Sequence, residues 1–157
     1  MVRICNININ GLNDVIKQKQ VIDFMKYYKI DIFLLQEHNI RNHNVICSEL
    51  DDFCFVILNL SVCHKGGTAI LIDKRFPVTV ISEEFSADSR ILSVKFKLYN
   101  KILHLVNIYA HSRNRAAERD NLFNVELLYY LRNNLHSTYI AGDWNCMMSD
   151  RVFIESY

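Results

Sequence analysis

Four strand-like apolar runs in this chain each end at a polar residue able to hold a metal ion or a phosphate. The runs are Arg3–Ile9, Ile30–Gln36, Ile102–Ile108 and Ser137–Gly142. The polar residues at their ends are Asn8 and Asn10, Glu37, Tyr109, and Asp143 and Asn145. In open sheets, ligands bind at the carboxyl ends of strands, so we expect these side chains to converge on one site. Carboxylates, amides and a phenol favour magnesium and phosphate over zinc or a thiolate nucleophile.

The length and charge of the chain limit its class. A chain of 157 residues, half of them apolar, predicts one globular domain. Lys and Arg number 18 against 17 for Asp and Glu, so no global basic field attracts a polyanion. The sequence still allows a local basic patch, formed by Arg113, Arg115 and Arg119. These arginines lie just past Tyr109, where they would contact a phosphate backbone. The alternative, a solvated helix face, is the commoner meaning of such a cluster.

Cysteine usage and the start of the chain indicate the compartment. Five cysteines, with no Cys-x-x-Cys pair, argue against a disulfide framework and against a structural zinc site. Residues 1–10 alternate apolar and polar positions, which is typical of a strand and not of a signal peptide. No apolar run approaches membrane-spanning length. We therefore expect an intracellular protein, in the nucleus or cytoplasm and not secreted, with no membrane partner.

The first part of the chain predicts a parallel crossover. After the first strand, Gly11 permits a turn, and Asn13 or Asp14 can cap a helix that ends near Lys29. The run Ile30–Gln36 is short and apolar, which predicts a buried strand. A strand, a helix and a second strand in this order favour a parallel pair.

The middle of the chain predicts antiparallel strands. The candidates are Phe53–Leu58, Thr68–Ile72, Val78–Glu83, Ile91–Leu98 and Ile102–Ile108. An amphipathic helix over Arg115–Arg132 follows, and its expected inward residues are Leu122, Phe123, Leu127, Leu128 and Leu131. The last strand then leads into Asp143, close to the final residue, Tyr157. We expect a mixed sheet with helices on one face and an uncovered second face.

Five motifs in this order resemble a known family. They are Cys5-Asn6-Ile7-Asn8-Ile9-Asn10-Gly11-Leu12, Leu35-Gln36-Glu37, Gly66-Gly67-Thr68-Ala69-Ile70-Leu71-Ile72, Asn107-Ile108-Tyr109-Ala110 and Gly142-Asp143-Trp144-Asn145. Together they resemble the successive motifs of the endonuclease/exonuclease/phosphatase superfamily. The residue sequences of the first and fourth motifs are similar to those in the apurinic-endonuclease-like domain of LINE-type non-LTR retrotransposons. The resemblance runs from Arg3 to about Arg151.

The resemblance implies an α/β fold with mixed sheets, the DNase I-like four-layered α/β sandwich. On this interpretation, residues 1–157 form a single partial domain, truncated before its C-terminal part, that supplies the first sheet and the beginning of the second. The family pattern continues with a further acidic residue and a Ser-Asp-His triplet. Ser149-Asp150-Arg151 lacks the histidine and does not match that triplet.

The resemblance also assigns roles to the residues at the strand ends. Glu37 would be the main ligand of Mg²⁺, or of Mn²⁺, with Asn8 as a further ligand or as a donor to a metal-bound group. Asp143 would orient or deprotonate the attacking water, Asn145 would stabilise the charged transition state, and Tyr109 would donate to a phosphate oxygen. Asn10, Arg113 and Arg115 are tentative substrate-binding residues. Taken singly, each of these residues also has a plain structural explanation, such as a turn, a cap or a loop.

The implied reaction is attack of water on a DNA phosphodiester, which leaves a 3′ hydroxyl. In a retrotransposon this nick would prime a reverse transcriptase domain encoded downstream. Because the family's histidine and its acidic partner are missing, we expect weak activity or none from this chain alone. The alternatives are a catalytically dead remnant and another activity of the superfamily, such as that of a repair endonuclease, an exonuclease or a phosphoesterase. A third alternative, a plain binding module, would need a basic face that the charge balance does not show.

Overall fold

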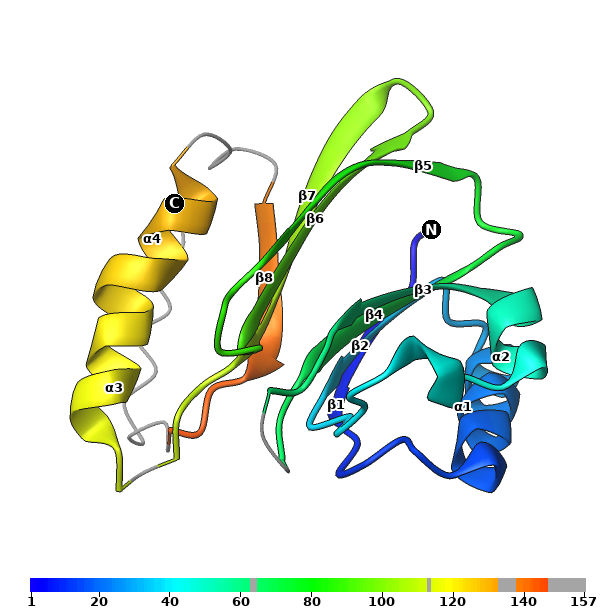
Figure 1. Cartoon of the computed structure of the whole chain (residues 1–157). Coiled ribbons are helices and arrows are strands. Elements are labelled where there is room, and N and C mark those ends of the chain that lie inside the picture. The colour runs from blue at the N-terminus through cyan, green and yellow to red at the C-terminus, as the bar shows by residue number, and fades with distance from the viewer. Residues whose placement is uncertain (63–64, 113, 133–137, 147–157) are drawn as a thin grey trace.

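The chain folds into four layers, with two sheets packed face to face between helices (Figure 1). The computed structural model describes residues 1–62, 65–112, 114–132 and 138–146. The first sheet has the order β1 (Ile4–Asn8), β2 (Ile32–Gln36), β4 (Thr68–Asp73), β3 (Cys54–Asn59). The second has the order β5 (Val78–Phe85), β6 (Ile91–Leu98), β7 (Lys101–Tyr109), β8 (Thr138–Asp143).

Helices cover the outer face of each sheet. Helices α1 (Val15–Tyr28) and α2 (Ser48–Phe53) lie on the first sheet. A short 3₁₀ turn, His43–Val45, precedes α2 in the chain. On the second sheet lies a helical rod made of α3 (Ala116–Asn121), a π-helical segment (Leu122–Glu126) and α4 (Leu127–Leu131). Within the part of the chain that the structure describes, no helix is both long and apolar enough to cross a membrane.

The predicted crossover at the start of the chain is confirmed. Strands β1 and β2 are parallel and are joined through α1. The carboxylate of Asp14 caps this helix by accepting from the backbone N–H of Ile16 at 2.6 Å. The helix ends at Lys29, which adopts the left-handed conformation with φ of 53°. The hairpin of β3 and β4 then adds to β2 in antiparallel fashion.

The second sheet is built from the predicted antiparallel run and a parallel strand. Strands β5, β6 and β7 form a meander, and β8 joins β7 in parallel after the helical rod. The strands lie where the apolar runs predict them, within a few residues at each end. The sequence did not predict α2, because Ser48–Phe53 is too short to show a helical period.

One expectation about the layers is wrong. The face of the first sheet that was expected to be uncovered packs against the second sheet through a buried apolar cluster. This cluster includes Ile32, Leu34 and Ile70 from the first sheet with Leu92, Val94 and Phe96 from the second. Among the described residues, the second sheet has four strands, as many as the first. Sequence periodicity shows which residues are apolar but not which sheet each strand joins.

The helical rod corrects one predicted core residue. Leu122, Leu127 and Leu131 are buried against the second sheet, whereas the side chain of Leu128 is 57% exposed. Leu128 lies about 100° around the helix axis from Leu127, which turns it away from the sheet that Leu127 and Leu131 contact. The π-helical segment Leu122–Glu126 adds one residue to its turn and so places Leu127, five residues after Leu122, on the same face as Leu122.

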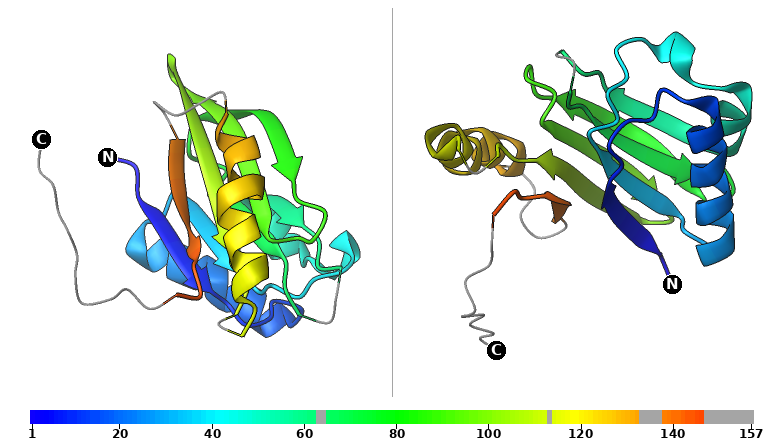
Figure 2. Two further views of the ribbon diagram at one scale, coloured as in Figure 1. Left: turned by 90° about the vertical axis from the view of Figure 1, so that its left-hand side faces the viewer. Right: turned by 90° about the horizontal axis from the view of Figure 1, so that it is seen from below.

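One side of the sandwich is open. Strands β1 and β8 are the edge strands of their two sheets and lie side by side (Figure 2). Their side chains that face the gap between the sheets are incompletely covered, with Ile4 43% and Tyr139 58% exposed. Among the described residues, no further strand pairs with either edge.

Candidate active site

The interface between the two sheets changes from apolar to polar along the strands. On β7, Leu103 and Leu105 pack between the sheets, and the next residues on the same face are Asn107 and Tyr109. On β2, Ile32 and Leu34 face the second sheet, and Gln36 follows them. Both strands become polar at the same end of the interface, where the candidate site residues lie.

Four of the predicted residues meet there in one hydrogen-bonded cluster, which we call the carboxylate cluster: Asn8, Glu37, Tyr109 and Asp143. The Nδ2 group of Asn8 donates to Oε1 of Glu37 and to Oδ2 of Asp143, each at 2.9 Å. The hydroxyl of Tyr109 donates to the same Glu37 oxygen at 2.7 Å. Asn8 and Glu37 come from the first sheet, and Tyr109 and Asp143 from the second. The cluster therefore exists only when both sheets are in place.

The backbone turns sharply at Glu37. This residue follows β2 directly and has a φ of 54°, a left-handed conformation that is uncommon for a residue with a side chain. Its neighbour His38 is fully buried and holds the turn. The Nδ1 atom of His38 accepts from the backbone N–H of Ile40 at 3.0 Å, and Nε2 lies 3.1 Å from the carbonyl of Asn59. The sequence did not predict this supporting role of His38, because an isolated histidine does not indicate which residues it will contact in the fold.

The imidazole of His38 is neutral at physiological pH. Burial lowers the pKa of His38 to about 4, since the charged form would lose its hydration. The two contacts also define the tautomer, because Nδ1 accepts a hydrogen bond and Nε2 must therefore carry the proton. Gly67 packs so closely on the ring that a Cβ there would lie 2.5 Å from Nε2. His38 thus links the loops after β2 and β3 into one support for Glu37.

Asp143 and Asn145 are held at the end of β8. The backbone N–H of Asn145 donates to Oδ1 of Asp143 at 3.1 Å, and the side-chain amide of Asn145 donates to the carbonyl of Ala110 at 2.8 Å. Arg119 donates to the carbonyl of Asn145 at 3.4 Å. Of the three arginines in the predicted basic cluster, Arg119 therefore contacts a site residue. The amide of Asn145 lies beside the carboxylate cluster but is not part of it.

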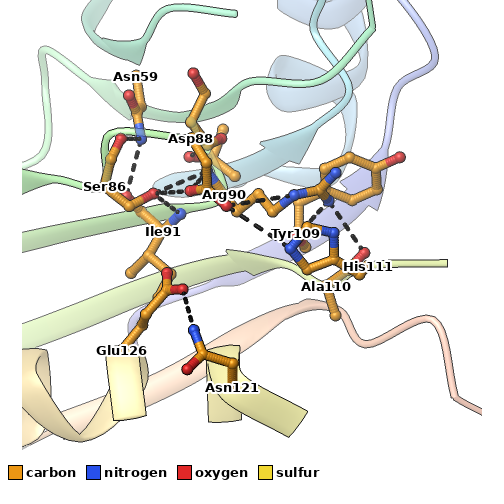
Figure 3. A network of polar contacts seen from close by, with 12 residues as sticks. Asn59, Ser86, Asp88, Arg90, Ile91, Tyr109, Ala110, His111, Asn121 and Glu126 are labelled. Atoms are coloured by element: carbon orange, nitrogen blue, oxygen red, sulfur yellow. Dashed lines mark hydrogen bonds and ion pairs between the residues drawn. The ribbon is translucent and has the colours of Figure 1, made fainter. Parts of the chain in front are cut away.

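Tyr109 has a cation against its ring. The guanidinium of Arg90 lies 4.8 Å from the ring centroid and donates to the carbonyls of Tyr109 and Ala110 at 3.1 and 3.3 Å (Figure 3). Asp88 lies 3.5 Å from Nε of Arg90 and helps to hold it. Burial, followed by the hydrogen bond and the charge of Glu37, raises the pKa of Tyr109 to about 12. The phenol therefore remains a protonated donor. No sequence pattern had singled out Arg90.

The remaining predicted residues have different outcomes. Asn10 is exposed, and its backbone N–H donates to Oδ1 of Asn8 at 3.1 Å, so it supports Asn8. Arg115 is an exposed residue at the start of α3, and none of its described hydrogen bonds reaches the carboxylate cluster. Arg113 lies outside the described residues, as do Ser149, Asp150 and Arg151.

The charge of the cluster suits a cation. Two carboxylates, those of Glu37 and Asp143, share one amide donor, and no described Lys, Arg or His forms an ion pair with either. Such a pair of like charges is stabilised by a bound positive ion. The described residues contain no group of three or more His, Cys, Asp or Glu that could hold a metal. An ion here would complete its shell with amide, water or phosphate oxygens, as Mg²⁺ commonly does.

Comparison with known proteins identifies the family. The sequence profile of the Endonuclease/Exonuclease/phosphatase family matches residues 5–155, nearly the whole chain. The chain belongs to this family. The match covers every residue of the carboxylate cluster. It does not distinguish a retrotransposon member from the others.

Solved structures show the same fold. TDP2 from C. elegans is similar with a TM-score of 0.71 and 22% identity, over 93% of this chain and 48% of that one. An AP endonuclease from Archaeoglobus fulgidus gives 0.68 and 20%, over 92% and 58%. The 3′ phosphatase NExo from Neisseria, which was solved bound to a product DNA hairpin, gives 0.73 and 15%, over 96% and 60%.

These likenesses confirm the predicted DNase I-like fold of the endonuclease/exonuclease/phosphatase family. At such low identity they establish the fold alone. The chain spans between 48% and 60% of the length of these three proteins. What each of them binds or cleaves is therefore only a guide to what this chain does.

Proposed function

We propose that this chain carries the hydrolytic site of a magnesium-dependent DNA endonuclease of the retrotransposon type. The observation that supports the proposal is the carboxylate cluster, in which Glu37, Asp143, Asn8 and Tyr109 meet at the carboxyl ends of strands from both sheets. Membership of the family supports phosphoester chemistry. The sequences of the motifs that contain Asn8 and Tyr109 favour the retrotransposon branch. A reverse transcriptase domain is the partner that this branch implies.

The residues present fit a hard divalent cation. Glu37 and Asp143 supply carboxylate oxygens that share one amide donor, Asn8, and no Lys, Arg or His in the described part of the chain forms an ion pair with either. Mg²⁺ or Mn²⁺ prefers such oxygen ligands. When bound, the ion would stabilise negative charge on the phosphate and make a water molecule more acidic. Glu37 is the principal ligand that we propose, with Asn8 beside it.

The other residues act through hydrogen bonds. Tyr109, kept protonated by its raised pKa, can donate from Oη to a phosphate oxygen. Asp143 accepts in this structure from Asn8 and from the backbone of Asn145, and its carboxylate can hold and deprotonate the attacking water. Asn145 has one side-chain N–H on Ala110, and its second N–H can donate to the charged transition state.

DNA is the substrate that we propose. The solved relatives include one bound to a DNA hairpin and one named as an AP endonuclease, and both are properties of those proteins. On this chain, the guanidinium groups of Arg90 and Arg119 lie beside Tyr109 and Asn145. Positive charge at that position favours a phosphate backbone.

The test is nicking of supercoiled plasmid DNA by the purified chain with Mg²⁺ and with EDTA. We expect slow nicking that requires Mg²⁺ and that Asp143→Asn reduces by about a hundredfold or more, to background. Lys97→Gln is the surface control and should reduce the rate only slightly, because this exposed residue of β6 pairs with Ile102, at the other end of β7 from Tyr109. Nicking that persists in Asp143→Asn at the wild-type rate would contradict the proposal.

A catalytically inactive site is the second candidate. The observation that favours it is that none of the described histidines, His38, His43, His104 and His111, hydrogen-bonds to the carboxylate cluster. A wild-type chain that binds Mg²⁺ through Glu37 but does not nick DNA would support this candidate. A chain that neither nicks DNA nor binds Mg²⁺ would contradict the metal site as well.

A further inference from the structure

One fully buried asparagine lies under the carboxylate cluster. Asn107 on β7 has no exposed surface, although its neighbours along the same face, Leu103 and Leu105, are apolar. Its Nδ2 group donates to the carbonyl of Leu35 at 2.9 Å and to the carbonyl of Ala69 at 2.8 Å. Leu35 is on β2 and Ala69 is on β4. Asn107 thus ties the second sheet to two strands of the first.

These contacts differ in kind from the apolar packing in the middle of the interface. Apolar packing between the sheets, as at Leu34 and Val94, is not directional and allows small sliding movements. Hydrogen bonds depend steeply on distance and angle, so two bonds from one buried amide define the relative position of two surfaces. Asn107 is therefore placed to set how β7 lies against β2.

The position of Asn107 relates directly to the carboxylate cluster. Tyr109 follows Asn107 by two residues on the same face of β7, and Glu37 follows Leu35 by two residues along the chain. The bond from Asn107 to Leu35 and the bond from Tyr109 to Glu37 are therefore successive contacts between the same two segments. A shift at the first contact moves the second.

A second amide extends this connection to all the strands of the site. Nε2 of Gln36, which is also fully buried, donates to Oδ1 of Asn107 at 2.6 Å and to Oδ1 of Asn6 at 2.7 Å. Asn6 on β1 donates in turn to the carbonyl of Gly142 on β8 at 3.3 Å. The buried Oε1 of Gln36 has no hydrogen-bond partner among the described residues, so this network carries a desolvation cost that apolar side chains would avoid.

We infer that Asn107 is a positioning residue, which sets the hydroxyl of Tyr109 against the carboxylate of Glu37 through its bonds to the first sheet. The functional meaning of this role rests on the proposed function, because Tyr109 and Glu37 are the groups that it aligns. Gln36 supports Asn107 from β2. The inference requires no metal and no DNA, and it can be tested without either.

The experiment observes the hydrogen bond of Tyr109 by NMR at neutral pH, in metal-free protein with ¹³Cζ-labelled tyrosine. Tyr109→Phe assigns the signal, and Glu37→Gln calibrates its change when the charged acceptor is lost. We expect Asn107→Leu to move the Tyr109 signal in the same direction as Glu37→Gln and by a comparable amount. Gln36→Met, which keeps Asn107 but removes its partner, should give a smaller shift in that direction.

Gln18 provides the matched control. It is a fully buried amide on α1 whose Nε2 donates to the carbonyls of Leu12 and Val45, on the outer side of the first sheet. Gln18→Leu should lower the melting temperature as Asn107→Leu does, but should leave the Tyr109 signal unchanged. An unchanged Tyr109 signal in a folded Asn107→Leu protein would overturn the inference. If that variant does not fold, an unchanged signal in Gln36→Met overturns it.

Mg²⁺ titration of the same samples separates this inference from the proposed function. A shifted Tyr109 signal in Asn107→Leu supports the positioning role whether or not the wild type binds Mg²⁺. The absence of Mg²⁺ binding would contradict the proposed metal site and leave the positioning result standing.

Discussion

The two ends of the interface between the sheets differ in what their side chains contribute. At one end, Phe96, Ile70 and Leu34 are buried in an apolar cluster with no polar group to satisfy. At the other end, on the same strands or their neighbours, Gln36 and Asn107 bring buried amides to the carboxylate cluster. The apolar end stabilises the fold. The polar end carries two neighbouring carboxylates and the Oε1 atom of Gln36, which has no hydrogen-bond partner among the described residues, and both features cost stability. In this sandwich, the residues that stabilise the fold and the residues of the candidate site therefore lie at opposite ends of the same interface.

The largest expected effect tests the apolar end. Phe96 is 1% exposed at the centre of the cluster between the sheets, so Phe96→Ala should lower the free energy of unfolding by about 3–5 kcal/mol. Denaturant unfolding measures this change. The affinity for Mg²⁺ should be unchanged wherever the variant remains folded. Phe85→Ala, at a residue 46% exposed on β5, is the control and should cost less than about 1 kcal/mol. An equal loss of unfolding free energy in Phe96→Ala and Phe85→Ala would contradict the stabilising role of the apolar end.

The second expected effect is the pH dependence due to His38. The pKa of His38 is about 4 in the folded protein, below the ordinary value of 6.5. At a pH between these two values, the unfolded chain therefore binds a proton at His38 that the folded protein does not bind. The stability from this group is present above pH 6.5 and is lost as the pH falls toward 4, by about 3 kcal/mol at most. Unfolding curves of wild type and His38→Gln over this range measure it. A parallel decline in both proteins would exclude His38 as the cause.

The third expected effect is the stabilisation of the polar end by metal. With a dissociation constant of about 1 mM, 10 mM Mg²⁺ should add roughly 1.4 kcal/mol to the free energy of unfolding. Glu37→Gln should lose this gain, and it should be at least as stable as wild type without metal because one of two neighbouring carboxylates is removed. Glu83→Gln, at an exposed glutamate on β5, should keep the gain. An equal response to Mg²⁺ in Glu37→Gln would place the metal elsewhere.

The smallest expected effect concerns the open edge, where β1 and β8 leave part of the interface exposed. Ile4→Thr with Tyr139→Thr should change the free energy of unfolding by less than about 1 kcal/mol, because both side chains are already partly in water. Binding of a hydrophobic dye and self-association should both decrease. Light scattering and dye fluorescence measure these changes. Leu128→Thr, on the exposed face of α4, is the control. An equal decrease in the control would show that the open edge is not special.

The sequence by itself predicted most of the elements and named the candidate residues that the structure brings together. The strands followed from apolar runs, and the end of α1 near Lys29 and a cap at Asn13 or Asp14 followed from local backbone chemistry, with the structure deciding for Asp14. Glu37, Tyr109 and Asp143 could be named because each stands where an apolar run stops. These signals are local, so they can be read from neighbouring residues alone.

Only the tertiary structure decided which strands form which sheet and what supports the site. The assignment of β5 to a second sheet depends on packing between residues far apart in the chain, which periodicity does not encode. For the same reason, only the structure shows the π turn that puts Leu127 on the same face as Leu122. The supporting roles of His38, Arg90 and Asn107 likewise follow from contacts across loops and sheets. Sequence spacing identifies side chains that share a face, but only folding brings two faces together.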